Sequence, residues 1–156
     1  MVRKRGRPAL SQRERLWANA EKRIQQQKTL RDLRGMSPAE FEQFVANLFT
    51  VQGYKATVVG GACDAGCDVK IHQRTGELWG IAQCKRYAEK GGVSAHQVRG
   101  FCGAYMLSGA TQGFIFTTGR LTRQAERPAR RFTWLKVFNR SNLAQYIEKV
   151  KEIQHL

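Results

Sequence analysis

An acid, an amide and an amine in this chain are spaced so that they can act together on a phosphate group: Asp68, Gln83 and Lys85. The polar stretch from Arg74 to Glu77 lies between them and predicts a hairpin turn. If the turn is symmetric, so that Arg74 faces Glu77, Asp68 lies directly opposite Gln83, with Cβ atoms about 5 Å apart. Lys85 is two residues beyond Gln83 and points to the same face of the strand. The spacing therefore predicts three converging side chains, as holding a divalent metal beside a scissile phosphate requires.

Phosphodiester hydrolysis explains why these residue types belong together. A bound Mg²⁺ neutralises the phosphate, orients the attacking water and lowers its pKa. Because Mg²⁺ prefers oxygen ligands and keeps several of its waters, one or two carboxylates suffice, and we expect Mg²⁺ or Mn²⁺ as the cofactor. Taken singly, Asp68 is equally well explained as a cap at the end of a loop, and Lys85 as a solvated strand residue. His72 and His96 are better explained by solvation or packing than by a role as a base.

Composition points to a polyanionic partner. The chain has 156 residues, a net charge of +15 and a pI near 10.4, which favours nucleic acid as the partner. No apolar run approaches the roughly 18 residues of a membrane span, and the N-terminus has no apolar signal region. We therefore expect one domain plus at most an appendage, in a cytoplasmic protein that associates with the nucleoid through DNA and not with a membrane.

The N-terminal 34 residues form a separate, more basic segment, with eleven Lys and Arg against three acids. Lys4, Arg5, Gly6, Arg7 and Pro8 are similar to an AT-hook core, in which flanking arginines enter a narrow minor groove. A generic electrostatic arm explains them almost as well, and either way the arm raises affinity more than specificity. A capping box at residues 11–14 then predicts a polar helix to residue 34, which packs on the domain, on a second subunit or along DNA.

The four cysteines, Cys63, Cys67, Cys84 and Cys102, contain no C-x-x-C pair, so a structural zinc site is not expected. Cys63 and Cys67 are close enough in sequence to meet. The simplest interpretation is buried or half-buried free thiols in a reducing compartment.

The remaining elements are those that must position the candidate residues. Ser37 and Glu40 form a second capping box around Pro38, and an apolar stripe follows in a helix that Gly53 ends. Alternating helices and strands in the second half favour an α/β fold, a mixed central sheet flanked by helices. We expect strands at about 54–59, 68–74, 77–85, 113–117 and 134–138, and helices at about 11–34, 38–52, 93–107, 122–131 and 141–152.

Alternation along the hairpin predicts an apolar back and a largely polar front. The back carries Val69, Ile71, Leu78 and Ala82, and the front carries Asp68, Lys70, His72, Gln83 and Lys85, with Trp79 and Ile81 among them.

Taken in order, several short motifs resemble the Mrr-type restriction endonuclease domain. They are Phe41-Glu42, Gly53-Tyr54, Gly60-Gly61, Asp64-Ala65-Gly66-Cys67-Asp68, Gln83-Cys84-Lys85-Arg86-Tyr87, Phe116-Thr117-Thr118-Gly119 and Asn142-Leu143. The resemblance covers about residues 35–150 and is to the Q-x-K variant of the PD-(D/E)xK nuclease superfamily. It implies a restriction-endonuclease-like αβββαβ core, a nuclease domain at residues 35–153, and a metal-dependent phosphodiesterase acting on DNA.

The resemblance also implies a role for each site residue. Asp68 is the main metal ligand, Gln83 supplies an oxygen near the metal, and Lys85 contacts the scissile phosphate or positions the attacking water. Glu42 matches the acidic residue of the family's first helix. Helical geometry places Glu42 at the rim of the buried face, beside Val45 and Phe49, from where it can reach the sheet edge.

Three residues near this site are expected to bind DNA: Arg86, which follows Lys85, and Gln97 and Arg99 in the next helix. For the latter two, an exposed helix face is an equally good explanation. The leading hypothesis is a DNA endonuclease of restriction type, built as one nuclease domain with a basic N-terminal DNA-binding extension. A homodimer would suit it, because cutting both strands needs two sites. The alternatives are a structure-selective nuclease, such as a Holliday-junction resolvase, and a non-catalytic DNA-binding protein on the same fold.

Overall fold

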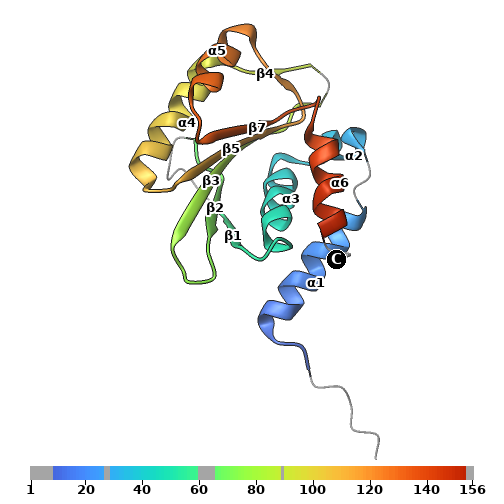
Figure 1. Cartoon of the computed structure of the whole chain (residues 1–156). Coiled ribbons are helices and arrows are strands. Elements are labelled where there is room, and N and C mark those ends of the chain that lie inside the picture. Colours follow the sequence, from blue (N-terminus) through green and yellow to red (C-terminus); the bar gives the residue numbers. More distant parts are fainter. Residues whose placement is uncertain (1–8, 27–28, 60–65, 89, 154–156) are drawn as a thin grey trace, which may run out of the picture.

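The structure, a computed structural model, describes residues 9–26, 29–59, 66–88 and 90–153. A central sheet lies between two layers of helices (Figure 1), so the predicted α/β fold is confirmed. The helices are α1 (Gln12–Gln26), α2 (Leu30–Arg34), α3 (Pro38–Thr50), α4 (Ala95–Ser108), α5 (Arg123–Arg131) and α6 (Leu143–Ile153). The strands are β1 (Lys55–Val58), β2 (Val69–His72), β3 (Leu78–Lys85), β4 (Gly92–Val93), β5 (Gln112–Thr117), β6 (Arg120–Leu121) and β7 (Leu135–Phe138).

The main sheet is mixed, with strand order β1-β2-β3-β5-β7. The first three strands are antiparallel, and β3, β5 and β7 are parallel. One face packs against α3 and α6 and the other against α4 and α5, so each face has its own buried cluster (Figure 1). The front of the hairpin, predicted to be largely polar, is therefore covered: Ile81 is fully buried and Gln83 is 5% exposed.

Helix α3 is the element that the sequence predicted best. Ser37 and Glu40 form the expected capping box, with Pro38 at the start of the helix. The expected stripe of Phe41, Phe44, Val45, Leu48 and Phe49 is buried. Gly53 comes after the helix has ended at Thr50, and its φ of +98° lies in the region that favours glycine, at the turn into β1.

The hairpin has the predicted register along most of β2, although its turn is one residue longer. Val69 pairs with Ala82 and Ile71 with Gly80, as a symmetric two-residue turn would require. The turn itself is closed by the N–H of Gln73 on the carbonyl of Glu77, so it has three residues between them. A bulge at Trp79 compensates, because β3 carries one extra residue between the two regular parts.

The bulge changes the face of two side chains. Leu78 packs against the α4–α5 side and Trp79 against the α3–α6 side, the reverse of the prediction. One extra residue shifts the two-residue period of a strand by one and so exchanges the faces.

The N-terminal helical segment is two helices, not one. A capping box formed by Ser11 and Glu14 begins α1, as predicted, and a second one at Thr29 begins α2. Of the three packing alternatives, the structure shows the first, since Ala20, Ile24 and Leu33 join the buried cluster that α3 and α6 form on one face of the sheet. The AT-hook-like residues 4–8 lie outside the described residues. Within the described part, no helix is long and apolar enough to cross a membrane.

Short-range signals account for the other differences. The two-residue strands β4 and β6 form a small parallel sheet that was not predicted. Ser94 caps α4, which therefore begins two residues later than expected. The N–H of Leu143 donates to the carbonyl of Asn139, and α6 begins at Leu143 and not at residue 141.

Candidate active site

Asp68 stands immediately before β2 and is half-buried. Its N–H donates to the carbonyl of Ala82 at 2.8 Å, and the regular pairs begin one residue later with Val69 and Ala82. Two successive residues thus lie against Ala82, and Asp68 is not simply opposite Gln83 as predicted. Its Oδ2 accepts the N–H of Cys84 at 2.7 Å. That bond holds one oxygen of the Asp68 carboxylate at the backbone of Cys84, the residue after Gln83. Asp68 is thereby kept at this end of β3.

Gln83 holds a buried polar atom with no partner. The side chain is 5% exposed, and its Oε1 makes no hydrogen bond within the described part of the chain. Burying a carbonyl oxygen without a partner costs free energy of about 1–3 kcal/mol. An oxygen kept in this state, one residue from the contact between Asp68 and Cys84, is suited to bind a cation.

Lys85 ends β3 at the carboxyl edge of the parallel part of the sheet, where it pairs with Thr117. Its backbone carbonyl accepts the hydroxyl of Thr117 at 2.7 Å and the N–H of Thr118 at 3.4 Å. Both threonines are fully buried. The hydroxyl of Thr118 also bonds to both backbone groups of Tyr87. These contacts fix the backbone that carries the Lys85 amine.

Glu42 reaches the same place from α3. Burial raises the pKa of its carboxyl above the usual range, the nearby Asp68 carboxylate raises it further, and Lys85 opposes the shift. Glu42 is half-buried. The structure thus brings Glu42 close to Asp68 and Lys85, as the helical geometry predicted, and the two carboxylates repel each other there.

Cys84 lies within this group of charges but has no charge of its own. Burial is the largest cause that raises the pKa of its thiol well above the usual range, followed by the carboxylates of Asp68 and Glu42. The thiol stays protonated. Cys67, Cys84 and Cys102 are all free and buried, which confirms the prediction for these three, whereas Cys63 lies outside the described residues.

The donor atoms at this edge fit a hard divalent cation. Two carboxylates and an unpartnered amide oxygen are all oxygen donors, the type that Mg²⁺ and Mn²⁺ prefer. Within the described ranges, no group of three or more His, Cys, Asp or Glu side chains has the arrangement of a metal site. Gln83, being an amide, is not one of these residue types.

The predicted DNA-binding residues differ in what they do. Arg99 is exposed at the beginning of α4, in agreement with a surface role. Gln97 is used within the protein: its Oε1 accepts the N–H of Ser94 at 2.9 Å and completes the cap of α4. Arg86 is half-buried and contacts the backbone of Arg34. The spacing of Ser94 and Gln97 is itself a capping-box signal that explains Gln97 from the sequence.

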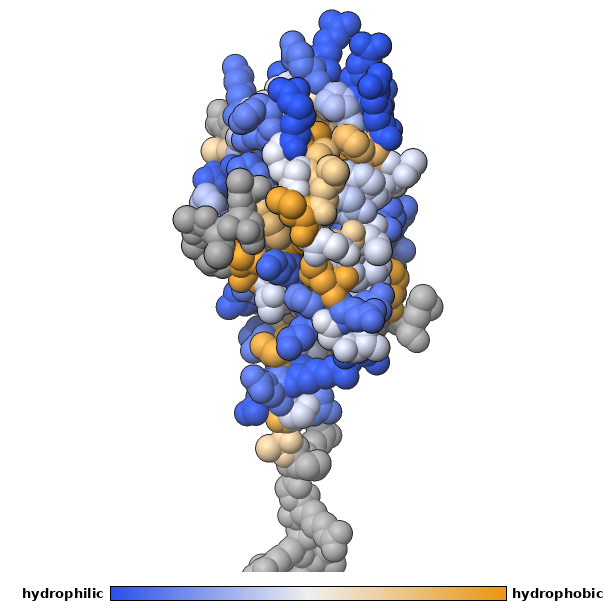
Figure 2. Space-filling model, turned by 90° about the vertical axis from the view of Figure 1, so that its left-hand side faces the viewer, coloured by the Kyte–Doolittle hydropathy of each residue, from blue (hydrophilic) through white to orange (hydrophobic). Residues whose placement is uncertain are grey.

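A basic surface on α5 was missed by the sequence analysis. Its four arginines are exposed, and Glu126 is the only acid of the helix. Helix α5 lies at the top of Figure 1, and the top of the molecule is strongly hydrophilic in Figure 2. The arginines are Arg123, Arg127, Arg130 and Arg131. Their signal was present in the sequence as a cluster of like charges in one short helix.

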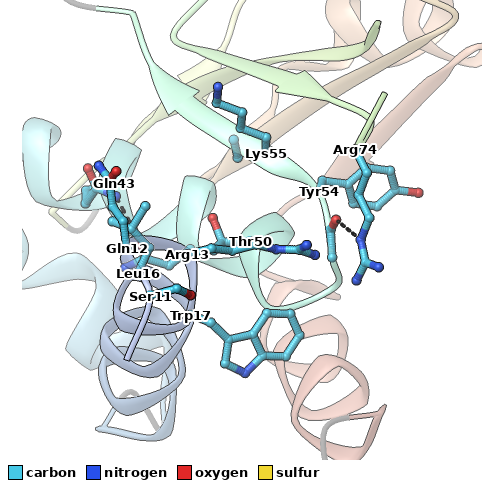
Figure 3. Close-up of a pocket in the computed structure, with 13 residues that line it drawn as sticks. Ser11, Gln12, Arg13, Leu16, Trp17, Gln43, Thr50, Tyr54, Lys55 and Arg74 are labelled. Carbon is cyan, nitrogen blue, oxygen red and sulfur yellow. Dashed lines mark hydrogen bonds between the residues drawn. The ribbon is translucent and has the colours of Figure 1, made fainter. Parts of the chain in front are cut away.

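A cavity of about 590 Å³ lies elsewhere, between α1, the end of α3, the start of β1 and the hairpin turn. Figure 3 shows Arg13 and Trp17 of α1 on one side of the cavity and Arg74 on the other, with the bond from Arg74 to the carbonyl of Gly53 marked. None of the four predicted catalytic residues lines this cavity. Size alone therefore does not identify the candidate active site.

Comparisons with known proteins agree with this geometry. The Mrr_cat family model, described as restriction endonuclease, matches residues 33–147. The restriction endonuclease FokI bound to DNA aligns with a TM-score of 0.53 at 14% identity, covering 99% of this chain and 33% of that chain. The MspJI restriction endonuclease in complex with a 27-mer oligonucleotide aligns with a TM-score of 0.50 at 18% identity, covering 94% and 35%. The chain thus spans about a third of each, and these two likenesses concern the fold. No curated protein matches the chain.

Proposed function

This chain belongs to the restriction endonuclease family, and from that premise we propose that it is a metal-dependent DNA endonuclease of Mrr-like type whose active site is the edge formed by Glu42, Asp68, Gln83 and Lys85. The observation that carries the proposal is the buried Oε1 of Gln83, which has no partner within the described residues and belongs to the residue before Cys84, whose N–H binds the Asp68 carboxylate. A divalent cation would satisfy that oxygen and relieve the repulsion between the acids.

Asp68, Glu42 and Gln83 would hold the cation, which supplies charge neutralisation and a water of lowered pKa. One oxygen of Asp68 is engaged by the N–H of Cys84, so the other is available to the metal. The raised pKa of Glu42 marks a carboxyl that gains from a nearby positive charge. Because Gln83 is neutral, the site carries one negative charge fewer than a site built from three acids and requires a higher metal concentration.

Lys85 would stabilise negative charge as it develops on the phosphate, which is the most effective use of a fixed cation in such a site. Its backbone is held by the buried hydroxyl of Thr117, so the amine is positioned before the substrate arrives. The neutral thiol of Cys84 keeps a further negative charge away from the substrate phosphate.

The partner we propose is double-stranded DNA, held by a surface that includes the exposed Arg99 and the arginines of α5. The basic arm at residues 4–8 would add affinity and keep the protein on the nucleoid. Cleavage of both strands requires two active sites, so we propose that the active form is a homodimer of nuclease domains spanning residues 35–153, each with the segment 1–34 as its DNA-binding extension.

The test is cleavage of supercoiled plasmid, methylated and unmethylated, with Mg²⁺. Asp68→Ala and Lys85→Ala are each expected to lower the rate by about 100-fold or more. Matched controls are Glu77→Ala in the turn and Lys136→Ala on β7, which remove the same charges from exposed positions. If the wild type does not cut any substrate in Mg²⁺ or Mn²⁺ but binds DNA, the protein is a non-catalytic DNA-binding protein. Preference for branched DNA would instead favour a junction resolvase.

A further inference from the structure

We propose that Arg34 and Arg86 together form an arginine seat for a second DNA phosphate, the one next to the scissile phosphate. The seat deepens the proposed function and rests on it for the identity of the ligand as DNA. It gives a role to Arg34, which lies in α2, before the helix that carries Glu42.

The two arginines reach across to each other's part of the chain. Arg86 Nη1 donates to the backbone carbonyl of Arg34 at 3.5 Å, and Arg34 Nη2 donates to the carbonyl of Thr118 at 3.3 Å. Thr118 is in turn bonded through its hydroxyl to Tyr87, the residue after Arg86. Residues 84 positions apart are thereby joined at the carboxyl edge of the sheet, beside Lys85.

Within the described residues, these bonds use one donor of each guanidinium group. The Nε atoms of Arg34 and Arg86 are buried and have no hydrogen-bond partner within the described residues. The two bonds that are made are long, and a bond of 3.5 Å is weak. A contact that only held α2 against the sheet would need one neutral hydrogen-bond donor on each side. A purely structural role therefore does not explain why both residues carry a positive charge.

Among the described residues, no acid compensates these two charges. Neither Arg34 nor Arg86 has a carboxylate partner in the part of the chain that the structure describes, where the ion pairs are Arg130–Glu126 and Lys151–Glu148. Two half-buried cations in one region of the molecule repel each other, and buried Nε donors without acceptors cost free energy. An anion with several acceptor oxygens removes both costs at once.

A backbone phosphate is the anion that fits. The planar guanidinium group presents its donors in a fork that matches phosphate oxygens, which an ammonium group does not. Arg86 follows Lys85 directly, and their Cα atoms are about 3.8 Å apart. The seat therefore lies beside the residue that we propose to contact the scissile phosphate, where the next phosphate of the same DNA strand would pass.

The first experiment measures binding of a 16-base-pair duplex of fixed sequence against salt concentration, in EDTA so that no DNA is cut. The variants are Arg34→Gln, Arg86→Gln and the double variant, in which glutamine keeps a neutral donor. Arg31→Gln is the matched control, because it removes the same charge from an exposed position of the same helix.

Each single variant is expected to lose roughly tenfold in affinity, since each removes a charged hydrogen bond to phosphate. The double variant should lose about 0.9 from the slope of log affinity against log salt, which corresponds to one phosphate. A loss of about 1.8 would mean two separate phosphates and would overturn the shared seat. Slopes equal to that of Arg31→Gln in all three variants would overturn the proposal altogether.

A second experiment separates the seat from the proposed function, with inorganic phosphate as the probe. Phosphate that binds only the folded protein raises its thermal midpoint, and the increase should be larger for the wild type than for the double variant. Equal increases overturn the seat whether or not the protein cuts DNA. A larger increase in the wild type supports the seat even if no nuclease activity is found, in which case only the proposed function fails.

Discussion

The two ends of the β2–β3 hairpin use their polar side chains in opposite ways. At the turn, Arg74 Nε donates to the carbonyl of Gly53, and Gln43 in the adjoining cavity donates to Asn47 at 3.0 Å. At the other end, Gln83 Oε1 is buried and has no partner among the described residues. The amides of Gln43 and Asn47 beside the cavity are thus bonded to each other, whereas the amide oxygen at the proposed site is not bonded. We therefore base the assignment of the site on the unpartnered oxygen and not on the volume of the cavity.

The strongest test of this difference removes one amide side chain from each end of the hairpin. Gln83→Leu should lower the cleavage rate by about 100-fold because a metal ligand is lost, while stability stays equal or rises because a buried unpartnered oxygen is removed. Gln43→Leu should leave the cleavage rate unchanged and lower the stability by about 1 kcal/mol, since the buried Asn47 loses its hydrogen-bond partner. Cleavage rate and thermal midpoint are measured for both. A loss of stability without loss of cleavage in Gln83→Leu would show that its oxygen is structural.

Gln83→Glu tests the proposed metal-binding role of this position directly, because it replaces the amide by an acid. The Mg²⁺ concentration for half-maximal activity should fall by about tenfold, because a charged ligand attracts the cation more strongly than a neutral one. Without metal the variant should be less stable than the wild type, since a buried carboxylate near Asp68 is added. The measurement is activity and thermal midpoint across a Mg²⁺ titration. An unchanged metal dependence would remove Gln83 from the metal site.

Threonines near both ends of β5 allow a matched test of backbone positioning. Thr117 is fully buried and its hydroxyl donates to the carbonyl of Lys85, while Thr111 is exposed and donates to that of Trp79. Thr117→Val should cost about 1–3 kcal/mol of stability and Thr111→Val less than about 1 kcal/mol. Denaturant unfolding measures both. If Thr117 positions Lys85, its variant also lowers the rate at saturating DNA with little change in KM, a split that a purely structural role would not produce.

The smallest expected effect is the pH dependence that Glu42 contributes. Its pKa is raised in the folded protein, mainly by burial and then by Asp68. The folded state therefore holds this proton more tightly than the unfolded chain, so the contribution is unfavourable above the folded pKa and disappears as the pH falls towards the unfolded value. Glu42→Gln should be slightly more stable than the wild type at neutral pH, and the gain should vanish in acid.

Thermal midpoints between pH 3.5 and 8, in roughly the range where a carboxyl titrates, measure this difference. Glu40→Gln is the control, because Glu40 is exposed and serves the cap of α3; it should give no gain. A gain for Glu42→Gln that persists in acid would contradict the electrostatic explanation. Mg²⁺ should stabilise the wild type more than Glu42→Gln, because it cancels the same repulsion.

Local patterns predicted the helices and most of the hairpin because their signals lie within a few residues. The capping box at Ser37 and the stripe to Phe49 determined α3, and the assumption of a symmetric turn placed Val69 against Ala82. The turn was wrong by one residue, and the bulge at Trp79 restored the register between Ile71 and Val69. Asp68 is not simply opposite Gln83, because Asp68 and Val69 both lie against Ala82. The faces of Leu78 and Trp79 were wrong because of the bulge.

The parts that could not be predicted depend on distant contacts. Arg34 meets Thr118 across 84 positions, and no periodicity connects them. The strands β4 and β6 have two residues each, which is too short for an alternating pattern of apolar and polar residues. Gln97 had a local signal that was not used, since its spacing from Ser94 is that of a capping box.

The bulge at Trp79 has a practical consequence for protein engineering. The bulge compensates for a change in the number of residues at the hairpin tip, so the change does not shift the pairing of Ile71, Lys70 and Val69 with β3. Trp79 and Lys85 are separated by about 20 Å of strand, at roughly 3.3 Å for each residue. The tip around Thr75 and Gly76, both exposed, is thus a suitable insertion point for a fluorescent label or a grafted loop, on the same hairpin as the proposed active site but away from its geometry.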